Sequence, residues 1–256
     1  MSNNKILFIV EGEVDEVSFL ERLYSQWNPG QKYEIYSYRT NIHILSQILC
    51  SEYPDFETND IDIRLVLRSR EKDDDKRRIL QEKYRDIYLI FDFEPQHNCP
   101  HFDIVRRMMG YFQDSTNQGK LFVNYPMMQS YKDFSALPDD SFKERSILVD
   151  KVKDYKQHIS KTSCLSDPKR LQYSTFVSIA VHHLRKANWI LTGEYKIPEV
   201  ENYLRWNGQD VFDKQVQLVN DERLVWILNT SVFLLVDYSP NRFFEGVKRK
   251  RQEFDI

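Results

Sequence analysis

Cysteine and glycine are scarce in this chain, and it has no long hydrophobic run. Only three cysteines, seven glycines and nine prolines occur among 256 residues. The cysteines, Cys50, Cys99 and Cys164, form no Cys-x-x-Cys pair, which argues against a disulfide framework and favours a reducing compartment. The longest apolar stretch, residues 224–236, is interrupted by Asn-Thr-Ser and is too short to span a bilayer. We therefore expect a cytoplasmic protein without a membrane partner, and we interpret residues 224–236 as a core helix.

The composition supports a large folded core with an uneven distribution of charge. Hydrophobic residues make up 41% of the chain and aromatic residues 14%, which excludes disorder as its main character. The net charge is only −3, so the molecule as a whole is not basic. Residues 1–150 carry 19 Lys and Arg against 26 Asp and Glu, whereas residues 151–256 carry 17 against 13. This asymmetry indicates an acidic and a basic half with different partners.

Short apolar runs alternate with helical periodicity in the first half of the chain. Strands alternating with helices indicate βαβ crossovers and a parallel sheet. Strands are predicted over 5–10, 32–38, 86–96 and 119–126, and helices over 14–27, 42–50 and 101–113. Residues 61–67 fit either a strand or the start of a helix, and the charged block 68–78 is typical of a solvated loop or an exposed helix.

The pattern becomes mainly helical after about residue 136. Helices are predicted over 141–159, 169–192, 198–206, 211–219 and 221–236. We therefore expect an α/β fold with a mainly parallel sheet flanked by helices over 1–136, and a mainly helical annex over 137–256.

Acidic residues follow two of the predicted strands directly. Glu11 ends the first strand, and Asp92 and Glu94 end the strand that begins near residue 86. Ligands of open parallel sheets bind beyond the carboxyl ends of the strands, so these carboxylates are expected to converge if the strands are neighbours. A divalent cation would relieve their repulsion, and hard oxygen ligands suit Mg²⁺ or Mn²⁺. Such an ion stabilises the attacking and leaving oxygens of phosphoryl transfer.

The residues that follow Glu11 differ in their predicted roles. Gly12 allows a tight turn and the close approach of a phosphodiester, and the helix that begins there favours an anion. Asp15 is either a further metal ligand or a partner of the helix dipole. For Glu13 and Glu16 the favoured role is only to complement the dipole.

The motifs "IVEGEVDEVSFLERL" and "LIFDFE" resemble the two acidic elements of Toprim domains, and "GKLFVNYPMMQSYKDF" resembles the later part of small bacterial Toprim proteins of the overcoming-lysogenization-defect nuclease branch. The resemblance covers roughly residues 1–135. It implies a Rossmann-like Toprim fold and a nuclease dependent on divalent metal, with Glu11 in acid-base work and Asp92 and Glu94 in metal binding. Asp92-Phe93-Glu94 replaces the usual Asp-x-Asp, and Gln129 stands where a glutamate is expected, which would weaken a second metal site. Lys132 is a candidate for charge neutralisation in catalysis.

The same resemblance implies a role in defence against phage, as an effector or beside an ATPase. The chain has no Walker loop, so an ATPase would be a separate polypeptide. The zinc module of primases and the large tyrosine-bearing domain of topoisomerases are absent. An alternative is a catalytically weak Toprim module that serves as a binding or regulatory subunit. A homo-oligomer remains open at this point.

The basic half supplies candidates for binding DNA or RNA, including tRNA. Cations interspersed with occasional aromatic residues are typical of phosphate-contacting surfaces, although solvated helix faces share this pattern. The candidates are Lys151, Lys153, Lys156, Lys161, Lys169, Arg170, Arg185 and Lys186. Residues 97–101, His-Asn-Cys-Pro-His, lack a fourth zinc ligand, so contact of His97 or His101 with substrate is favoured over zinc.

Overall fold

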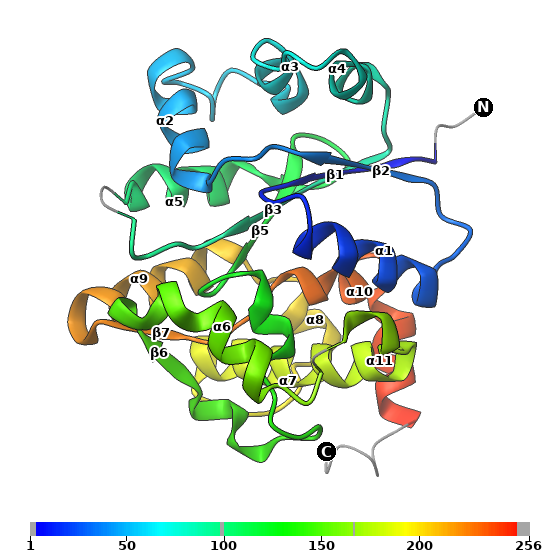
Figure 1. Ribbon diagram of the computed structural model, residues 1–256, viewed down its shortest axis with the longest axis vertical. Coiled ribbons are helices and arrows are strands. Elements are labelled where there is room, and N and C mark those ends of the chain that lie inside the picture. Colours follow the sequence, from blue (N-terminus) through cyan, green and yellow to red (C-terminus); the bar gives the residue numbers. More distant parts are fainter. Residues whose placement is uncertain (1–3, 98–99, 166, 250–256) are drawn as a thin grey trace.

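The computed structural model describes residues 4–97, 100–165 and 167–249 (Figure 1). Its five-stranded sheet has the order β2-β1-β3-β5-β4 and is parallel except for the edge pair β4–β5. The predicted α/β class with a mainly parallel sheet and a mainly helical C-terminal part is confirmed. Its elements up to β5 are β1 (Ile6–Val10), α1 (Asp15–Trp27), β2 (Tyr33–Ser37), α2 (Ile42–Glu52), α3 (Ile63–Arg68), α4 (Asp74–Gln81), β3 (Asp86–Asp92), α5 (Phe102–Tyr111), β4 (Gln113–Asp114) and β5 (Gly119–Asn124).

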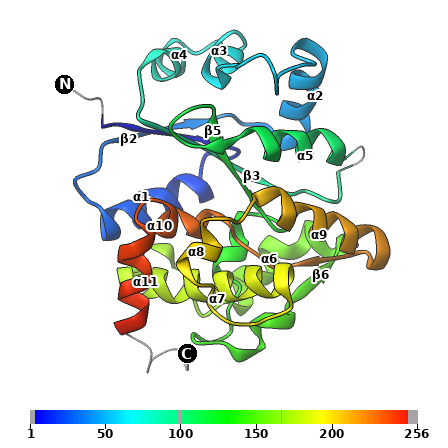
Figure 2. The ribbon, with the colours of Figure 1, turned by 180° about the vertical axis from the view of Figure 1, so that it is seen from behind.

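Helices cover both faces of this sheet. In Figures 1 and 2, α2 to α5 lie on one face, and α1 lies with the C-terminal helices on the other. All five residues of β1 are buried, which is why this strand has a continuous apolar sequence without alternation. The charged block 68–78 contributes the exposed helix α4, and residues 63–68 form α3 and not a strand.

The second half is helical, with one strand pair that the periodicity did not predict. Its elements are η1 (Met128–Lys132), η2 (Asp140–Glu144), β6 (Ser146–Leu148), η3 (Val149–Lys151), α6 (Val152–Thr162), η4 (Pro168–Arg170), α7 (Tyr173–Thr192), α8 (Val200–Tyr203), α9 (Gly208–Glu222), β7 (Leu224–Trp226), η5 (Ser231–Phe233), α10 (Leu234–Asp237) and α11 (Pro240–Arg249). The predicted helices 141–159 and 221–236 are wrong in part, because β6 and β7 pair antiparallel within them.

The polar residues inside the apolar stretch 224–236 explain why no continuous helix forms there. The buried Asn124 at the end of β5 accepts hydrogen bonds through Oδ1 from the backbone N–H groups of Thr230 and Ser231. The Asn229 side-chain amide donates to the Met128 carbonyl at 2.9 Å. These bonds join the C-terminal part to the end of the central sheet, so a local pattern alone does not determine the conformation of this segment.

One buried cluster contains residues from both sides of residue 136, including Phe8 and Phe91 of the sheet and Phe176 and Leu235 of the later helices. The division into 1–136 and 137–256 stays a prediction. Among the described residues, no helix combines the length and the apolar character needed to cross a membrane.

Candidate active site

Glu11 and Asp92 meet at the carboxyl ends of neighbouring parallel strands. β1 pairs with β3 in a register that places Val10 beside Ile90, so the residues that follow lie side by side. Glu11 Oε2 accepts a hydrogen bond from the backbone N–H of Asp92 at 3.0 Å. Asp92 Oδ1 in turn accepts from the backbone N–H of Met128 at 2.8 Å, in the segment after β5. The strand register therefore brings two of the predicted site residues into direct contact.

These carboxylates share a low-dielectric environment that disfavours their charge. Burial raises the pKa of Glu11 to about 8, against the lowering effect of the Asp92 N–H, and the charges of Glu94 and Glu16 raise it further. Burial also raises the pKa of Asp92 well above its usual range, with Glu11, Glu16 and Glu94 adding to the effect. Glu94 has a pKa raised by burial, which the nearby His97 opposes. The three predicted acids thus form one electrostatic group.

Glu16 also belongs to this group, although the sequence pattern favoured only an interaction of Glu16 with the helix dipole. Its side chain is buried, and burial raises its pKa. A Cβ atom added to Gly12 would lie 2.6 Å from Glu16 Oε2, so the space beside Gly12 holds this carboxylate. Gly12 therefore makes room for Glu16, and the prediction that it makes room for a phosphodiester has no support in this geometry. The spacing of Glu16 from Leu20 and Leu23, which are buried on the same helix, was the signal that could have identified it.

Asp15 occupies a different position, bound to one cation and one amide. Its Oδ2 accepts a hydrogen bond from Gln129 Nε2 at 2.7 Å and from the Lys156 ammonium. Lys132 lies close enough to Asp15 and Lys156 for their charges to shift its pKa. Burial lowers its pKa and Lys156 lowers it further, whereas Asp15 raises it. Gln129, Lys132 and Lys156 therefore surround Asp15, and Gln129, at the position where the resemblance implies a glutamate, is a donor to this carboxylate.

Histidines line the other side of Glu94, whose backbone has a left-handed φ of 45°. His43 is buried on α2, and burial together with His97 lowers its pKa to about 4. Its Nδ1 accepts from the backbone N–H of His101 at 3.3 Å, and its ring lies 4.9 Å from that of His97. His43 is thus a neutral residue packed beside the site. Residues 98 and 99, between the two predicted substrate-contacting histidines, lie outside the described part.

The candidate cations for nucleic-acid binding divide into exposed and internal groups. Lys151, Lys153, Lys161, Lys169 and Arg170 are exposed on η3, α6 and η4. Arg185 is half-buried, with its guanidinium 4.5 Å from the centre of the Tyr195 ring.

Lys186 is fully buried, and the prediction that it binds nucleic acid is wrong for this fold. Its ammonium donates to the carbonyls of Phe142 and Arg145, and burial lowers its pKa well below the usual value. Because the spacing of Lys186 from Val177, Ala180 and Leu184 follows the buried face of α7, the helical period could have identified it as internal.

The acidic group fits a divalent cation in its chemistry, because it offers hard oxygen donors whose mutual repulsion a cation would reduce. The positions of these carboxylates, however, do not form a complete metal site. In the ranges 4–97, 100–165 and 167–249, no three His, Cys, Asp or Glu side chains are gathered in a geometry that could hold a metal ion. Glu11 and Asp92 each use an oxygen to accept a backbone N–H group.

Comparison of this chain with protein-family models, with curated proteins and with solved structures gives no match. The resemblance to Toprim domains therefore stays a prediction, carried by the two acidic motifs and by their position in the chain.

Proposed function

We propose that this protein is a phosphodiester hydrolase, a nuclease that depends on Mg²⁺ or Mn²⁺. The observation that supports the proposal best is the convergence of Glu11 and Asp92, with Glu16 and Glu94 in electrostatic reach, at the carboxyl edge of the central sheet. Four acids that disfavour one another's charge are typical of sites whose function requires that charge, and they cluster less often for structural reasons.

Glu11, Asp92 and Glu94 would hold the metal, with Glu16 as a further carboxylate. When bound, the metal would polarise the phosphodiester and lower the pKa of a water molecule. Glu11 is also the candidate for exchanging a proton with the attacking water or the leaving oxygen, as the Toprim resemblance implies. Lys132, which lies near Asp15, is a candidate for neutralising charge on the phosphate. Exposed lysines of α6 would bind the backbone of DNA or RNA.

The proposal is tested with nuclease assays on labelled single-stranded and duplex DNA, RNA and tRNA, with Mg²⁺, Mn²⁺ or a chelator. Cleavage is expected only with metal. Glu11→Gln keeps the shape of the side chain and its acceptor for the Asp92 N–H, and it should lower the rate by a factor of the order of 10² or more. Glu13→Gln is the matched control, because Glu13 is exposed and paired with Arg39 and Lys76. Equal rates for wild type and Glu11→Gln on every substrate would contradict the proposal.

A second candidate is a binding or regulatory Toprim-like module with weak catalysis. The observation in its favour is that Gln129 and Lys156 both bind Asp15, where a second metal would otherwise find a carboxylate. If the protein has this second function, we expect it to bind nucleic acid without metal and without cleavage. A role in phage defence, a separate ATPase subunit, a homo-oligomer and a cytoplasmic location rest on the sequence alone and stay predictions.

A further inference from the structure

The loop between β2 and α2, residues 38–41, lies directly beside the acidic group. The backbone N–H of Arg39 donates to the Glu11 carbonyl at 2.9 Å, so β2 continues its pairing with β1 past the ends of both strands. Two residues later, the Asn41 side chain hydrogen-bonds the Glu94 carboxylate. Direct contacts therefore fix this loop against two of the four acids.

The backbone of Arg39 has an unusual conformation for its residue type. Its φ of 66° lies in the left-handed region, which non-glycine residues seldom adopt and which concentrates at functional sites. Among the described residues, Glu94 and Arg223 share this feature. Arg223 is the C-cap of α9, where a left-handed backbone is common, whereas Arg39 and Glu94 both lie at the acidic group. The conformation of Arg39 at this edge of the sheet therefore points to a function of its side chain.

The guanidinium of Arg39 keeps most of its donors available. Its Nε donates to Glu13, and 60% of the Arg39 side chain is exposed to solvent. In the part of the chain that the structure describes, neither Nη1 nor Nη2 of Arg39 has a hydrogen-bond partner. Asp73 lies within reach of the charge of Arg39, but no hydrogen bond joins these two described residues. Four of the five N–H groups can therefore reach a ligand, and a guanidinium binds a phosphate through two such groups at once.

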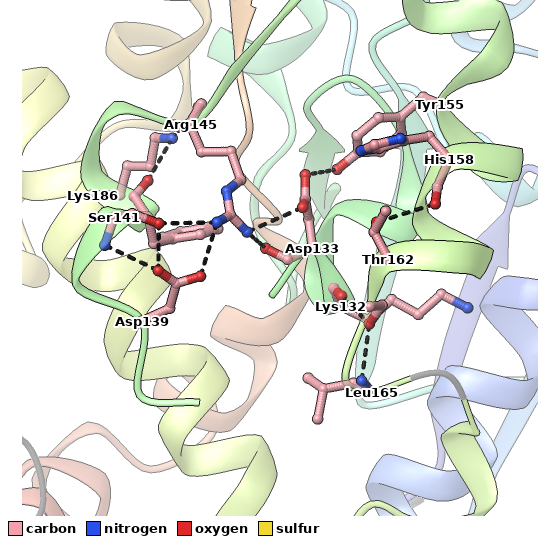
Figure 3. Close-up of polar contacts among 12 residues, drawn as sticks. Lys132, Asp133, Asp139, Ser141, Arg145, Tyr155, His158, Thr162, Leu165 and Lys186 are labelled. Atoms are coloured by element: carbon pink, nitrogen blue, oxygen red, sulfur yellow. Dashed lines mark hydrogen bonds and ion pairs between the residues drawn. The ribbon is translucent and has the colours of Figure 1, made fainter. Parts of the chain in front are cut away.

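The strand order places cations on both sides of the acidic group. Along the order β2-β1-β3-β5, Arg39 follows the first strand and Lys132 follows the last. Glu11 and Asp92 lie at the ends of the two strands between them. Figure 3 shows the Lys132 side chain pointing away from the hydrogen-bonded carboxylate of Asp133. A substrate strand that crosses the acids would therefore meet a cation on either side.

We propose that Arg39 binds a backbone phosphate of the nucleic-acid substrate on the β2 side of the acidic group. This inference rests on the proposed function for its class of ligand. The substrate strand would cross the carboxyl edge of the sheet from η1 and α6 toward the loop 38–41. Two strand spacings of about 4.8 Å separate Arg39 from Asp92, and successive phosphates of a stacked strand rise by about 3.4 Å, so the bound phosphate lies within about three nucleotides of the cleaved bond. Glu13 contacts Nε and lies outside this contact, which the two Nη groups make.

The first experiment measures binding with the full chain in the Glu11→Gln background, with metal chelated so that no strand is cut. Fluorescence anisotropy follows labelled single-stranded and duplex DNA, and the matching RNA, at several salt concentrations. Adding Arg39→Gln should reduce the slope of log K against log salt by about 0.7 for single strands and about 0.9 for duplex DNA, the value of one lost phosphate contact. Arg39→Lys keeps the charge and should keep the slope. Arg205→Gln removes the same charge at an exposed position just after α8 and should leave the slope unchanged.

The second experiment locates the contact through cleavage. With Mg²⁺ or Mn²⁺, the wild type and Arg39→Gln cut an end-labelled oligonucleotide in which one phosphate is replaced by a neutral methylphosphonate. Wild-type cleavage should fall about tenfold at bonds whose contacted phosphate is neutral, which leaves gaps in the cleavage pattern. One gap within about three nucleotides of the methylphosphonate should be absent in Arg39→Gln, because this variant has no contact to lose, and present in Arg205→Gln.

The results of these two experiments distinguish the Arg39 contact from the nuclease proposal. With wild-type cleavage present, an unchanged salt slope in Arg39→Gln, an equal fall in Arg205→Gln, or identical gaps in the wild type and Arg39→Gln overturns the phosphate contact and leaves the nuclease proposal intact. A reduced slope in Arg39→Gln alone, without any metal-dependent cleavage by the wild type, supports the contact and contradicts the nuclease proposal. If no oligonucleotide binds, both fail.

Discussion

Glu11 combines a structural contact with an unfavourable charge. Its carboxylate accepts the Asp92 N–H, yet burial and the charges of Glu94 and Glu16 raise its pKa to about 8. In the unfolded chain an isolated glutamate has a pKa near 4.5, so folding moves this group toward its protonated form. Between these two values the folded state binds more protons than the unfolded state, and stability falls as the pH rises.

Replacement of Glu11 by Gln should therefore change the pH dependence of stability. The amide keeps the acceptor for the Asp92 N–H and carries no charge, so Glu11→Gln should be more stable than the wild type at pH 8, by the order of 1–2 kcal/mol. The difference should shrink toward pH 4.5, where the wild-type carboxyl is protonated in the folded state and about half protonated in the unfolded state. Urea unfolding from pH 4.5 to pH 9 with metal chelated measures this. A constant difference across this range would mean that Glu11 is not the titrating group.

At the scale of elements, β5 connects the site to the C-terminal half. The Asn124 amide oxygen accepts from the N–H groups of Thr230 and Ser231, at 3.2 Å each, and from the Ser231 hydroxyl at 2.9 Å. Four residues later, the Met128 N–H binds Asp92. The same short segment therefore positions the acidic group and fixes the C-terminal chain.

Asn124→Ala removes one acceptor from three buried or half-buried donors. The free energy of unfolding should fall by about 2–4 kcal/mol, because the donors lose their partner in a buried place. Chemical denaturation at pH 7 gives this value. Asn207→Ala is the control: Asn207 caps α9 through a single bond to the Gln209 N–H, and its loss should lower stability by only about 1 kcal/mol.

Helix α6 separates an internal from an external face. Val152, Tyr155 and Ile159 are buried, whereas Lys153 and Lys161 are exposed. On the internal face the Tyr155 hydroxyl donates to Asp133, and the external face is the predicted phosphate-binding surface.

The double change Lys153→Glu and Lys161→Glu should weaken nucleic-acid binding and reduce its salt dependence. Two lost phosphate contacts lower the slope of log K against log salt by about 1.5. Filter binding or anisotropy at several salt concentrations measures the slope. Arg205→Glu with Lys214→Glu makes the same charge change at exposed positions near and on α9, outside the predicted surface, and should leave the slope unchanged. An equal effect of both pairs would show that only net charge matters.

At the scale of the whole molecule, both halves contribute to one buried cluster and to the site. The sheet supplies Glu11 and Asp92, whereas α6 of the C-terminal half supplies Lys156 to Asp15. Ligand binding at the acidic group is therefore expected to stabilise the molecule as a unit.

Mn²⁺ or Mg²⁺ should raise the unfolding temperature, and more strongly at pH 8 than at pH 6. The raised pKa values of Glu11 and Asp92 mean that a cation must displace protons, so its affinity increases with pH. Calorimetry in two buffers of different ionisation enthalpy should detect proton release of up to about one or two protons at pH 7. Glu11→Gln should lose most of the stabilisation, and Glu13→Gln should retain it. Stabilisation that is independent of pH would contradict binding at these acids.

The sequence by itself determined the parallel sheet and the position of its principal acids. Continuous apolar runs such as Ile6–Val10 are explained by strands that are buried on both faces, and an acid directly after such a run must lie at the carboxyl edge. The sequence predicted that Glu11 and Asp92 meet only if their strands are neighbours. It could not predict the strand order, because pairing between distant strands leaves no local pattern.

Only the tertiary structure decided which groups surround the buried Glu16 and Lys186, and it alone placed the strand β7 inside an apolar stretch. Each depends on contacts with residues far along the chain: Asp92 for Glu16, Phe142 for Lys186 and the strand β6 for β7. The helical period can mark a charged residue as inward, as it does for Glu16 and Lys186, but it does not identify the distant groups that this residue will meet. The free energy of burial and of the hydrogen bonds to distant partners makes that choice, and it exists only once the chain has folded.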